Sequence, residues 1–568
     1  MKRPASEWQR QSTAKVNAGR AVTIDRIGEC ALLVTLGTGI SPTLSEAVHA
    51  LADNLRQLGI AGVLEIVPAY ASVLVTFDDS VAEAEEVAGY VRQALALGGP
   101  NWITSPRNHS IPVVYGGEHG PDLESLSAAL GLSPAELVRR HSSGTYRVYF
   151  LGFMPGFAYL GGLDPTIAAP RLASPRVRVP LGSVGIAGEQ TGVYPISSPG
   201  GWQLIGRTGV SLWDVHRNPP ALLAPRDQVQ FVVSADLILT DSTTAYAGEQ
   251  HEPGSLAAFT VESPGALTLV QDLGRPGYSH FGLSSGGAMD PLALEAANLL
   301  VGNAPGAAAL EITWSGPTLR AHATTVVGLA GSDLGCQVDG VPVPCGISWL
   351  VRAGSELRFL ARRGSTGARC YVSVMGGFSV PPVLGSRSTY LPGGFGGYGG
   401  RQLRAGDTLF RGATTQSPAE VAGKVASVLP STAQPTTSLR YVPYLGTGCV
   451  SAKLREQAHS VTYEVGAASD RMGVRLLPEK EGVIAWSGGE LTSFGVPRGA
   501  IQLPPSGTPV VLGADHQTTG GYPVLGVVAR ADWPLLAQLT PGSKVRLQPV
   551  TLEEARAARS AKLFRQPI

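Results

Sequence analysis

The chain has 568 residues, which is too long for one hydrophobic core, so it should divide into roughly three to five domains. Its 44 Lys and Arg residues against 43 Asp and Glu residues give a net charge of +1, so no global field favours nucleic acid or an anionic membrane. The sequence contains no apolar run of about 18 residues and no C-x-x-C pair among its five cysteines. We therefore expect a cytoplasmic protein without a membrane span, a zinc site or a disulfide framework, whose partners are small molecules or proteins.

The first predicted elements form a small α+β domain over residues 20–104. Residues 1–19 are basic but have no apolar segment behind them, so they predict a disordered tail and not a signal peptide. Within residues 41–59 an N-cap Ser, a following Pro and a final Gly mark the two ends of a helix. Together with the flanking β-branched runs and a second helical segment, this predicts a β-α-β-β-α order.

Strands and tight turns dominate the rest of the chain, because its 72 glycines and 43 prolines separate short β-branched runs. Residues 105–247 contain one capped helix that ends at His141 and then strands that predict a closed or nearly closed barrel. Residues 258–412 and 439–552 are predicted as two further strand-rich regions. Residues 413–438 are rich in Ala, Ser, Thr and Pro and predict a linker, and residues 553–568 predict a C-terminal tail.

One phrase occurs twice. VPLGSV (residues 179–184) precedes EQTGVYP (189–195), and VPRGAI (496–501) precedes HQTTGGYP (516–523). The repeat predicts two domains built on one barrel plan. Its Gly and Pro residues fit simple turns, whereas Gln190 and Gln517, each followed by Thr, offer donors and acceptors that suit an amide, a carboxylate or a phosphate.

Glycine-rich motifs indicate neither a standard nucleophile nor a standard nucleotide site. GLSSG (282–286) matches the G-x-S-x-G pattern, but no clear strand leads into Ser284 and no Asp and His partners can be named. A loop that cradles substrate or phosphate is the better interpretation. GGFGGYGG (393–400) contains G-x-G-x-x-G, yet a strand-like segment follows where a dinucleotide site needs a helix. The sequence has no Walker A motif, so ATP would bind by another route or on a partner.

Four segments carry a family resemblance: LGFMPGFAYLGGLDP (151–165), PRVRVPLGSVGIAGEQTGVYPISSPGGWQLIGRT (175–208), VQDLGRPGYSHFGLSSGGAMD (270–290) and LGADHQTTGGYP (512–523). They are similar to the two "allophanate hydrolase subunit" families. These families include the Kip-type proteins, which are the B and C subunits of bacterial ATP-dependent 5-oxoprolinase, and the carboxyltransferase region of urea carboxylase. The chain resembles a B–C fusion with the B-like part ending near residue 245 and the C-like part beginning near residue 258.

The resemblance implies a fold that is mainly β with α+β, in which the small α+β domain precedes one cyclophilin-like barrel in the B-like half and two in the C-like half. It also implies an ATP-dependent amidohydrolase that opens 5-oxo-L-proline to L-glutamate together with an A-type subunit of the lactam-utilisation family. ATP, accompanied by Mg²⁺, is expected to phosphorylate the amide oxygen before water attacks, which requires cations, backbone donors and a group for proton transfer.

Two alternatives remain for the function. A carboxyltransferase component would move CO₂ from carboxybiotin to urea or a related amide, although the chain has no biotin-accepting segment. A regulatory protein would inhibit a histidine kinase through a docking surface alone. A homo-oligomer is compatible with each of these functions.

Polar residues within the family motifs supply the candidate site. The expected catalytic residues are His141, Asp272, Arg275, Asp515 and Gln517. The expected residues for substrate or nucleotide binding are Gln190, Tyr194, Trp202, Gln203, Arg207, Ser284, Asp290, Asp470, Arg471, Gln502 and Thr518, and no metal ligands are expected. His141 equally suits a helix C-terminus, Trp202 suits core packing better than recognition, and each charged residue suits an ion pair that pins a loop slightly better than a ligand contact.

Overall fold

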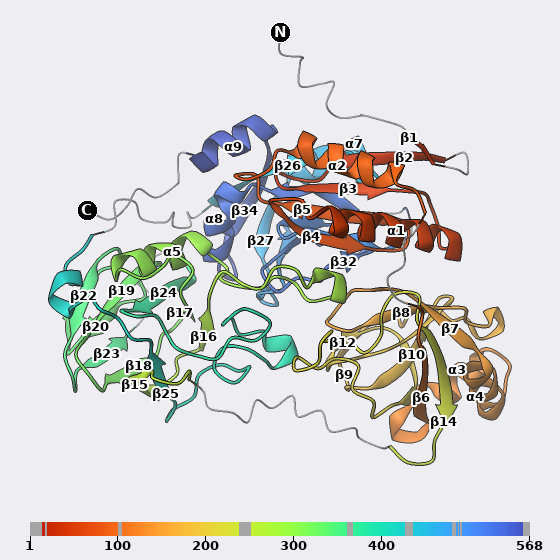
Figure 1. Cartoon of the computed structure of the whole chain (residues 1–568), viewed down its shortest axis with the longest axis horizontal. Coiled ribbons are helices and arrows are strands. Elements are labelled where there is room, and N and C mark those ends of the chain that lie inside the picture. Colours follow the sequence, from red (N-terminus) through yellow and green to blue (C-terminus); the bar gives the residue numbers. More distant parts are fainter. Residues whose placement is uncertain are drawn as a thin grey trace, which may run out of the picture.

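The computed structural model describes residues 14–16, 20–99, 105–237, 251–360, 367–425, 436–479, 484, 486, 488 and 491–560. These residues form an α+β domain, two closed barrels and a region of two facing sheets (Figure 1). The predicted fold class, mainly β with α+β, is confirmed. Within these ranges the helices are too short or too polar to cross a membrane. The predicted domain boundary at 247 and much of the predicted linker lie outside the described residues.

The N-terminal domain is a sheet with the strand order β1-β2-β3-β5-β4, covered by two helices. Its strands are β1 (Ala14–Val16), β2 (Arg20–Arg26), β3 (Ala31–Thr35), β4 (Val63–Pro68) and β5 (Ser72–Phe77). Helix α1 (Pro42–Leu58) begins after Ser41, whose hydroxyl accepts a hydrogen bond from Leu44 N, and ends at Gly59 in the left-handed conformation. Helix α2 (Ala84–Ala96) follows β5. Strand β1 pairs with β2 inside the segment that was predicted as a disordered tail, so that prediction is wrong for residues 14–16.

The two closed barrels have the same strand connectivity. The order is β10-β11-β8-β7-β14-β6-β13 in the first barrel and β30-β31-β28-β27-β34-β26-β33 in the last. In both, the first and last strands are parallel neighbours and all other pairs are antiparallel. The strands are β6 (Asn108–Tyr115), β7 (Thr145–Leu151), β8 (Ala158–Gly161), β10 (Ser183–Ala187), β11 (Gln190–Val193), β13 (Gln203–Arg207) and β14 (Gln228–Val233), and then β26 (Thr436–Pro443), β27 (Thr462–Val465), β28 (Gly473–Pro478), β30 (Ala500–Gln502), β31 (Val510–Leu512), β33 (Val524–Val528) and β34 (Lys544–Pro549).

Only the first half of the repeated phrase maps onto equivalent strands. The V-P-x-G segments turn at Gly182 and Gly499, which both have positive φ, and lead into β10 and β30. Gln190 begins barrel strand β11, whereas the second Gln-Thr phrase ends in β32 (Thr519–Gly520), which pairs outside the barrel with β29 (Phe494–Gly495). In the first barrel the counterpart of that hairpin is β9 (Arg176–Val179) with β12 (Ser198–Gly200). Gln190 and Gln517 therefore occupy different positions in the barrel plan.

The expected third barrel is instead a sandwich of two open sheets, with the orders β21-β20-β23-β18-β15-β25 and β16-β17-β24-β19-β22. Within the described ranges the edge strands of one sheet do not pair with those of the other, and both sheets enclose one apolar core. Helix α5 (Pro291–Leu300) packs on β19 and β24. The strands are β15 (Leu256–Ser263), β16 (Leu267–Gln271), β17 (Ala309–Thr313), β18 (Thr318–Ala321), β19 (Thr325–Gly331), β20 (Cys336–Val338), β21 (Val341–Pro342), β22 (Ser348–Val351), β23 (Glu356–Phe359), β24 (Arg369–Val374) and β25 (Thr408–Arg411).

Short helices complete the described chain. The first barrel carries α3 (Leu123–Ala129) and α4 (Pro134–Ser143), and the last barrel carries α7 (Ala452–Ser460) and α8 (Trp533–Gln538). Helix α6 (Pro418–Val421) lies within the predicted linker, where the buried Val421 accepts a hydrogen bond from the Ser348 hydroxyl through its carbonyl oxygen. That part of the segment is thus attached to the sandwich.

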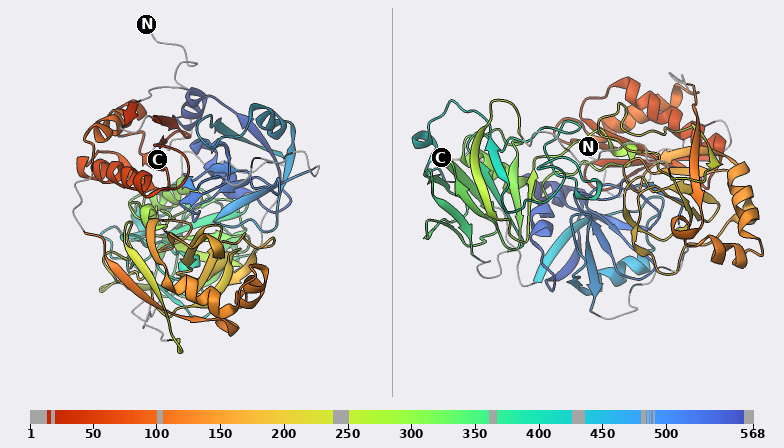
Figure 2. Two further views of the ribbon diagram at one scale, coloured as in Figure 1. Left: turned by 90° about the vertical axis from the view of Figure 1, so that its right-hand side faces the viewer. Right: turned by 90° about the horizontal axis from the view of Figure 1, so that it is seen from below.

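The N-terminal domain packs against the last barrel, as Figure 2 shows. One apolar cluster joins side chains of both: Ile27, Leu33, Leu74, Phe494, Val496 and Val527. Helix α9 (Leu552–Ser560) strengthens this contact, because Arg559 pairs with the buried Asp79 at 2.7 Å. The prediction of a tail from residue 553 is therefore wrong as far as residue 560. Thr551 and Glu554 cap the start of this helix. The Arg559–Asp79 ion pair attaches its end to the N-terminal domain.

Candidate functional site

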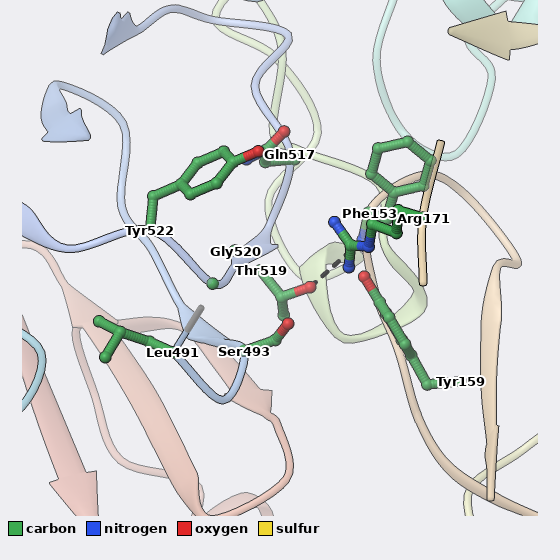
Figure 3. Close-up of a pocket in the computed structure, with 10 residues that line it drawn as sticks. Phe153, Tyr159, Arg171, Leu491, Ser493, Gln517, Thr519, Gly520 and Tyr522 are labelled. Atoms are coloured by element: carbon green, nitrogen blue, oxygen red, sulfur yellow. Dashed lines mark hydrogen bonds between the residues drawn. The ribbon is translucent and has the colours of Figure 1, made fainter. Parts of the chain in front are cut away.

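A pocket of about 140 Å³ lies between the two barrels (Figure 3). Phe153, Tyr159 and Arg171 line it from the first barrel. The opposite wall comes from the last barrel: Leu491, Ser493, Gln517, Thr519, Gly520, Gly521 and Tyr522. The guanidinium of Arg171 and the hydroxyl of Tyr159 turn toward Thr519. Both the B-like and the C-like part of the chain are therefore needed to form this pocket.

Thr519 joins the two walls. Its hydroxyl accepts a hydrogen bond from the backbone N–H of Phe153 at 3.3 Å, and Phe153 has a φ of 65°. A Cβ atom on Gly152 would lie 2.1 Å from the Thr519 hydroxyl oxygen, so only glycine permits this approach. The glycine-rich start of the LGFMPGF motif thus brings the first barrel against β32.

Aromatic packing holds Tyr159 in place. Its ring stacks on Phe150 at 4.5 Å between centroids and meets Phe157 edge-on at 5.1 Å. Tyr70 of the N-terminal domain packs edge-on against Phe150. Burial raises the pKa of Tyr159 to about 12, although the positive charge of Arg171 and hydrogen bonds with Thr519 and Ser493 oppose the shift. The phenol is therefore protonated at neutral pH and serves the pocket as a hydrogen-bond donor.

The structure brings two predicted glutamines together at the pocket. Gln517 donates a hydrogen bond from Nε2 to Oε1 of the buried Gln502, with a distance of 3.1 Å. A Cβ atom on Gly520 would lie 2.6 Å from Gln502 Nε2, so a larger residue at position 520 would displace the Gln502 carboxamide. The bond leaves the carboxamide oxygen of Gln517 available as an acceptor. Burial lowers the pKa of the neighbouring His516 to about 4, so its imidazole is neutral at neutral pH.

Two other predicted residues form a buried ion pair. The Arg471 guanidinium donates to both carboxylate oxygens of Asp515, at 2.8 and 3.0 Å, and to Glu311 of the sandwich. It also donates to the carbonyl oxygen of Gly287 at 2.6 Å. Burial lowers the pKa of Arg471, but Asp515 and Glu311 outweigh burial and raise it above its usual value. This geometry favours the ion-pair alternative, in which both residues fasten the last barrel to the sandwich.

Asp272 and Arg275 lie in the loop between β16 and α5. Asp272 accepts hydrogen bonds from the hydroxyls of Ser386 and Ser388, from Gly274 N and from Arg387 N. These hydrogen bonds occupy the Asp272 carboxylate and attach its loop to residues 386–388. Arg275 is buried, lies 5.4 Å from the centroid of Phe395 and donates to carbonyl oxygens at 383 and 388. Burial lowers its pKa.

The predicted residues of the first barrel lie away from the pocket wall. His141 is buried in the barrel, where its ring bonds Tyr115 at 2.7 Å and Thr191 at 2.9 Å. Burial lowers the pKa of His141 to about 3, so the ring is neutral. Tyr194 and Trp202 pack in the aromatic cluster that supports Tyr159. The side chain of Gln203 donates a hydrogen bond to the carbonyl oxygen of Pro170, and that of Arg207 donates one to the carbonyl oxygen of Leu181. Gln190 is the first residue of strand β11.

The remaining predicted residues have local roles or lack partners. Asp470 accepts bonds from Met472 N and Gly473 N in a turn. Asp290 caps α5 by accepting from Ala293 N, and burial raises its pKa to about 6. Ser284 and Thr518 are buried, and their hydroxyls have no hydrogen-bond partner among the described residues. In those ranges no group of three or more His, Cys, Asp or Glu side chains could hold a metal ion.

Sequence reasoning missed several residues of the pocket wall. Phe153 and Tyr159 lie in the LGFMPGFAYLGG motif, and Thr519 and Tyr522 lie in HQTTGGYP, so the family motifs contained the signal. No motif marked Arg171 or Ser493.

Comparisons with known proteins agree with the two-part structure. Residues 22–223 match the family described as "Carboxyltransferase domain, subdomain C and D", and residues 281–549 match "Carboxyltransferase domain, subdomain A and B". Among curated proteins, the 5-oxoprolinase B subunit of Bacillus subtilis is 43% identical over 219 residues, which are 37% of this chain and 91% of that protein. The 5-oxoprolinase C subunit of Escherichia coli is 36% identical over 295 residues, which are 52% of this chain and 92% of that protein.

A urea amidolyase of Lachancea kluyveri is 31% identical over 54% of this chain, but the match spans only 18% of that protein. The crystal structure of TTHA0988 has a TM-score of 0.80 and 35% identity, covering 91% of this chain and 99% of that one. The chain therefore belongs to the carboxyltransferase-domain family that includes the B and C subunits of 5-oxoprolinase, and it carries a B-like part and a C-like part in one polypeptide.

Proposed function

We propose that this protein is the B–C component of an ATP-dependent 5-oxoprolinase and that it opens 5-oxo-L-proline to L-glutamate together with an A-type subunit. The pocket between the barrels carries the proposal, because its walls come from the B-like and the C-like part of the chain. The similarity to the 5-oxoprolinase B and C subunits supports it, since each of these relatives matches one of the two parts.

The lining of the pocket suits the functional groups of 5-oxoproline. Arg171 supplies a cation for the carboxylate, and the free carboxamide oxygen of Gln517 is an acceptor for the lactam N–H. The hydroxyls of Tyr159 and Ser493 are donors for the lactam oxygen. A protonated phenol is required for that role, which agrees with the raised pKa of Tyr159.

In the proposed reaction the lactam oxygen attacks the γ-phosphorus of ATP and ADP leaves. Water then adds to the activated carbon, the C–N bond breaks, and glutamate and phosphate are released. Donors around the lactam oxygen stabilise the charge that develops during phosphoryl transfer. Mg²⁺ would arrive with the nucleotide and is not assigned to side chains of this chain.

The experiment is to measure glutamate and ADP release from 5-oxoproline and ATP, with the full chain alone and with the A-type protein of the same organism. The proposal predicts equal amounts of both products in the mixture. No release from the mixture, with both proteins folded, would contradict it.

Carboxyl transfer is the second candidate, and a specific observation favours it: both matched families are described as parts of a carboxyltransferase domain. In that reaction the pocket would hold urea or a similar amide beside carboxybiotin supplied by another chain. Transfer of labelled carboxylate from carboxybiotin to urea, without ADP or glutamate release from 5-oxoproline, would favour this candidate over the first.

A further inference from the structure

Phe153 lies at the centre of a strained turn in the pocket wall. The backbone N–H of Met154 donates a hydrogen bond to the carbonyl oxygen of Gly152 at 2.7 Å, and the intervening Phe153 has a φ of 65°. A three-residue turn that such a bond closes around a positive φ is the rare and strained form of the γ-turn. Because a bulky side chain disfavours this backbone conformation, contacts from the surrounding structure must maintain it.

Two other parts of the molecule supply those contacts. Thr519 of the last barrel accepts a hydrogen bond from the N–H of Phe153 at 3.3 Å. Gly282, in the segment between β16 and α5, approaches the turn so closely that a Cβ atom there would lie 2.2 Å from the carbonyl oxygen of Met154. The last barrel and the segment that follows β16 therefore both hold the turn of the first barrel in its strained conformation.

The turn presents the ring of Phe153 to the pocket. Figure 3 shows Phe153 beside Arg171 on one side of the pocket, across from Leu491 and Tyr522 of the last barrel. The ring is half-buried and meets Phe157 edge-on at 5.5 Å between centroids, which fixes its orientation. Phe153 thus gives the pocket an apolar surface next to a cation.

An apolar surface favours only ligands that have apolar atoms to place against it. The ring of 5-oxoproline contains two methylene groups, whereas urea contains none. Burying a methylene group against an aromatic ring stabilises a complex, and a fully polar amide gains nothing comparable. Arg171 and Gln517, in contrast, offer hydrogen bonds to either ligand.

We infer that Phe153 is a specificity-determining residue. The strained turn holds its ring against the methylene face of a lactam ring, and the pocket thereby selects a cyclic amide with a hydrocarbon face over a fully polar amide such as urea. This inference deepens the proposed function and rests on it for the identity of the ligand. The alternative is that the turn serves only to join the two barrels, in which case the ring would not affect binding.

Substitutions at position 153 test the turn and the ring separately. Phe153→Gly and Phe153→Ala both remove the ring, but only Gly relaxes the positive φ, and Phe153→Leu retains an apolar side chain. Trp314→Gly is the matched control, because Trp314 is an aromatic residue with a φ of 66° that lies in the sandwich and not in the pocket lining. Melting temperature without ligand, and calorimetric Kd for 5-oxoproline and for urea, are measured with the full chain.

We expect Phe153→Gly and Phe153→Ala to weaken the Kd of 5-oxoproline by about tenfold and Phe153→Leu by about threefold or less, with no change in Trp314→Gly. Urea should bind the wild type about tenfold more weakly than 5-oxoproline or not measurably. Without ligand, Phe153→Gly should melt about 1–3 °C above Phe153→Ala, because only Gly adopts a positive φ without strain. At an ordinary position the order would be the reverse.

Each contrary result has a distinct meaning. Unchanged 5-oxoproline affinity in Phe153→Gly and Phe153→Ala would overturn the inference and leave the proposed function intact, whereas a wild type that does not bind 5-oxoproline would contradict both. Urea that binds the wild type as tightly as 5-oxoproline, or that loses as much affinity in these variants, would overturn the selection against polar amides. A higher melting temperature for Phe153→Ala than for Phe153→Gly would overturn the strained turn.

Discussion

The hydroxyl of Thr519 in the last barrel accepts a hydrogen bond from the backbone N–H of Phe153 in the first barrel, across 3.3 Å. Replacing Thr519 by Val keeps the shape but leaves this N–H without an acceptor, a cost of about 1–3 kcal/mol where the two walls meet. We expect Thr519→Val to lower kcat/KM for 5-oxoproline by roughly tenfold, while Thr519→Ser retains most of it. Equal kinetics in the Val and Ser variants would show that the bond does not align the walls.

Arg171 is the cation that we assign to the substrate carboxylate. Loss of a charge-assisted hydrogen bond costs about 1.5–3 kcal/mol, so Arg171→Gln should raise KM for 5-oxoproline by about tenfold or more and change kcat less. Arg178 is the matched control, since it lies on β9 outside the pocket wall and bonds the Ser197 hydroxyl. Steady-state kinetics of Arg171→Gln and Arg178→Gln test this assignment, and a similar rise of KM in both would refute it.

Gln190 and Gln517 are the equivalent glutamines of the repeated phrase, but they occupy different places in the fold. Gln517→Ala removes an acceptor from the pocket, so kcat/KM should fall by about 10- to 100-fold. The protein should stay folded but melt somewhat lower, because Oε1 of the buried Gln502 loses its donor. Gln190→Ala should stay close to the wild type. If Gln190→Ala loses as much activity as Gln517→Ala, the repeated phrase and not the pocket wall marks the functional residues.

Asp79 ties the N-terminal domain to the end of the chain through Arg530 at 3.0 Å and Arg559 at 2.7 Å. Burial raises its pKa, but hydrogen bonds and charges from these arginines outweigh burial and lower the pKa below its usual value. Because Arg530 and Arg559 lose their carboxylate partner in Asp79→Asn, we expect a loss of about 2–4 kcal/mol in the free energy of unfolding at neutral pH.

The effect of Asp79 should depend on pH in one direction. A carboxyl whose folded-state pKa is lowered stabilises the fold above its unfolded pKa of about 4, and this contribution is lost as pH falls through the folded value. Urea unfolding of the wild type and Asp79→Asn should therefore show a difference that shrinks between about pH 5 and pH 2. A difference that stays constant or grows on acidification would contradict the ion-pair explanation.

The sequence predicted local patterns well and long-range contacts poorly. Ser41 and Gly59 bound α1 as expected, because caps are local signals. The V-P-x-G repeat predicted two barrels of one plan, and Gln502 and Gln517 meet at the pocket. The role of Asp272 was not visible, since its partners Ser386 and Ser388 lie more than a hundred residues away.

Two other features depended on tertiary contacts that no short pattern encodes. Helix α9 extends where a tail was predicted, because its Arg559 pairs with Asp79 at the other end of the chain. Arg171 lies in an irregular segment and becomes part of the pocket only when the last barrel supplies Gln517 and Thr519 opposite it.

The most direct test of the central claim is a crystal structure of the full chain with 5-oxoproline bound. The account predicts the ligand between the two barrels, with its carboxylate at Arg171, its lactam N–H at Gln517 and its lactam oxygen at Tyr159 or Ser493. A ligand held by one barrel alone, or bound elsewhere while this pocket contains only solvent, would contradict it.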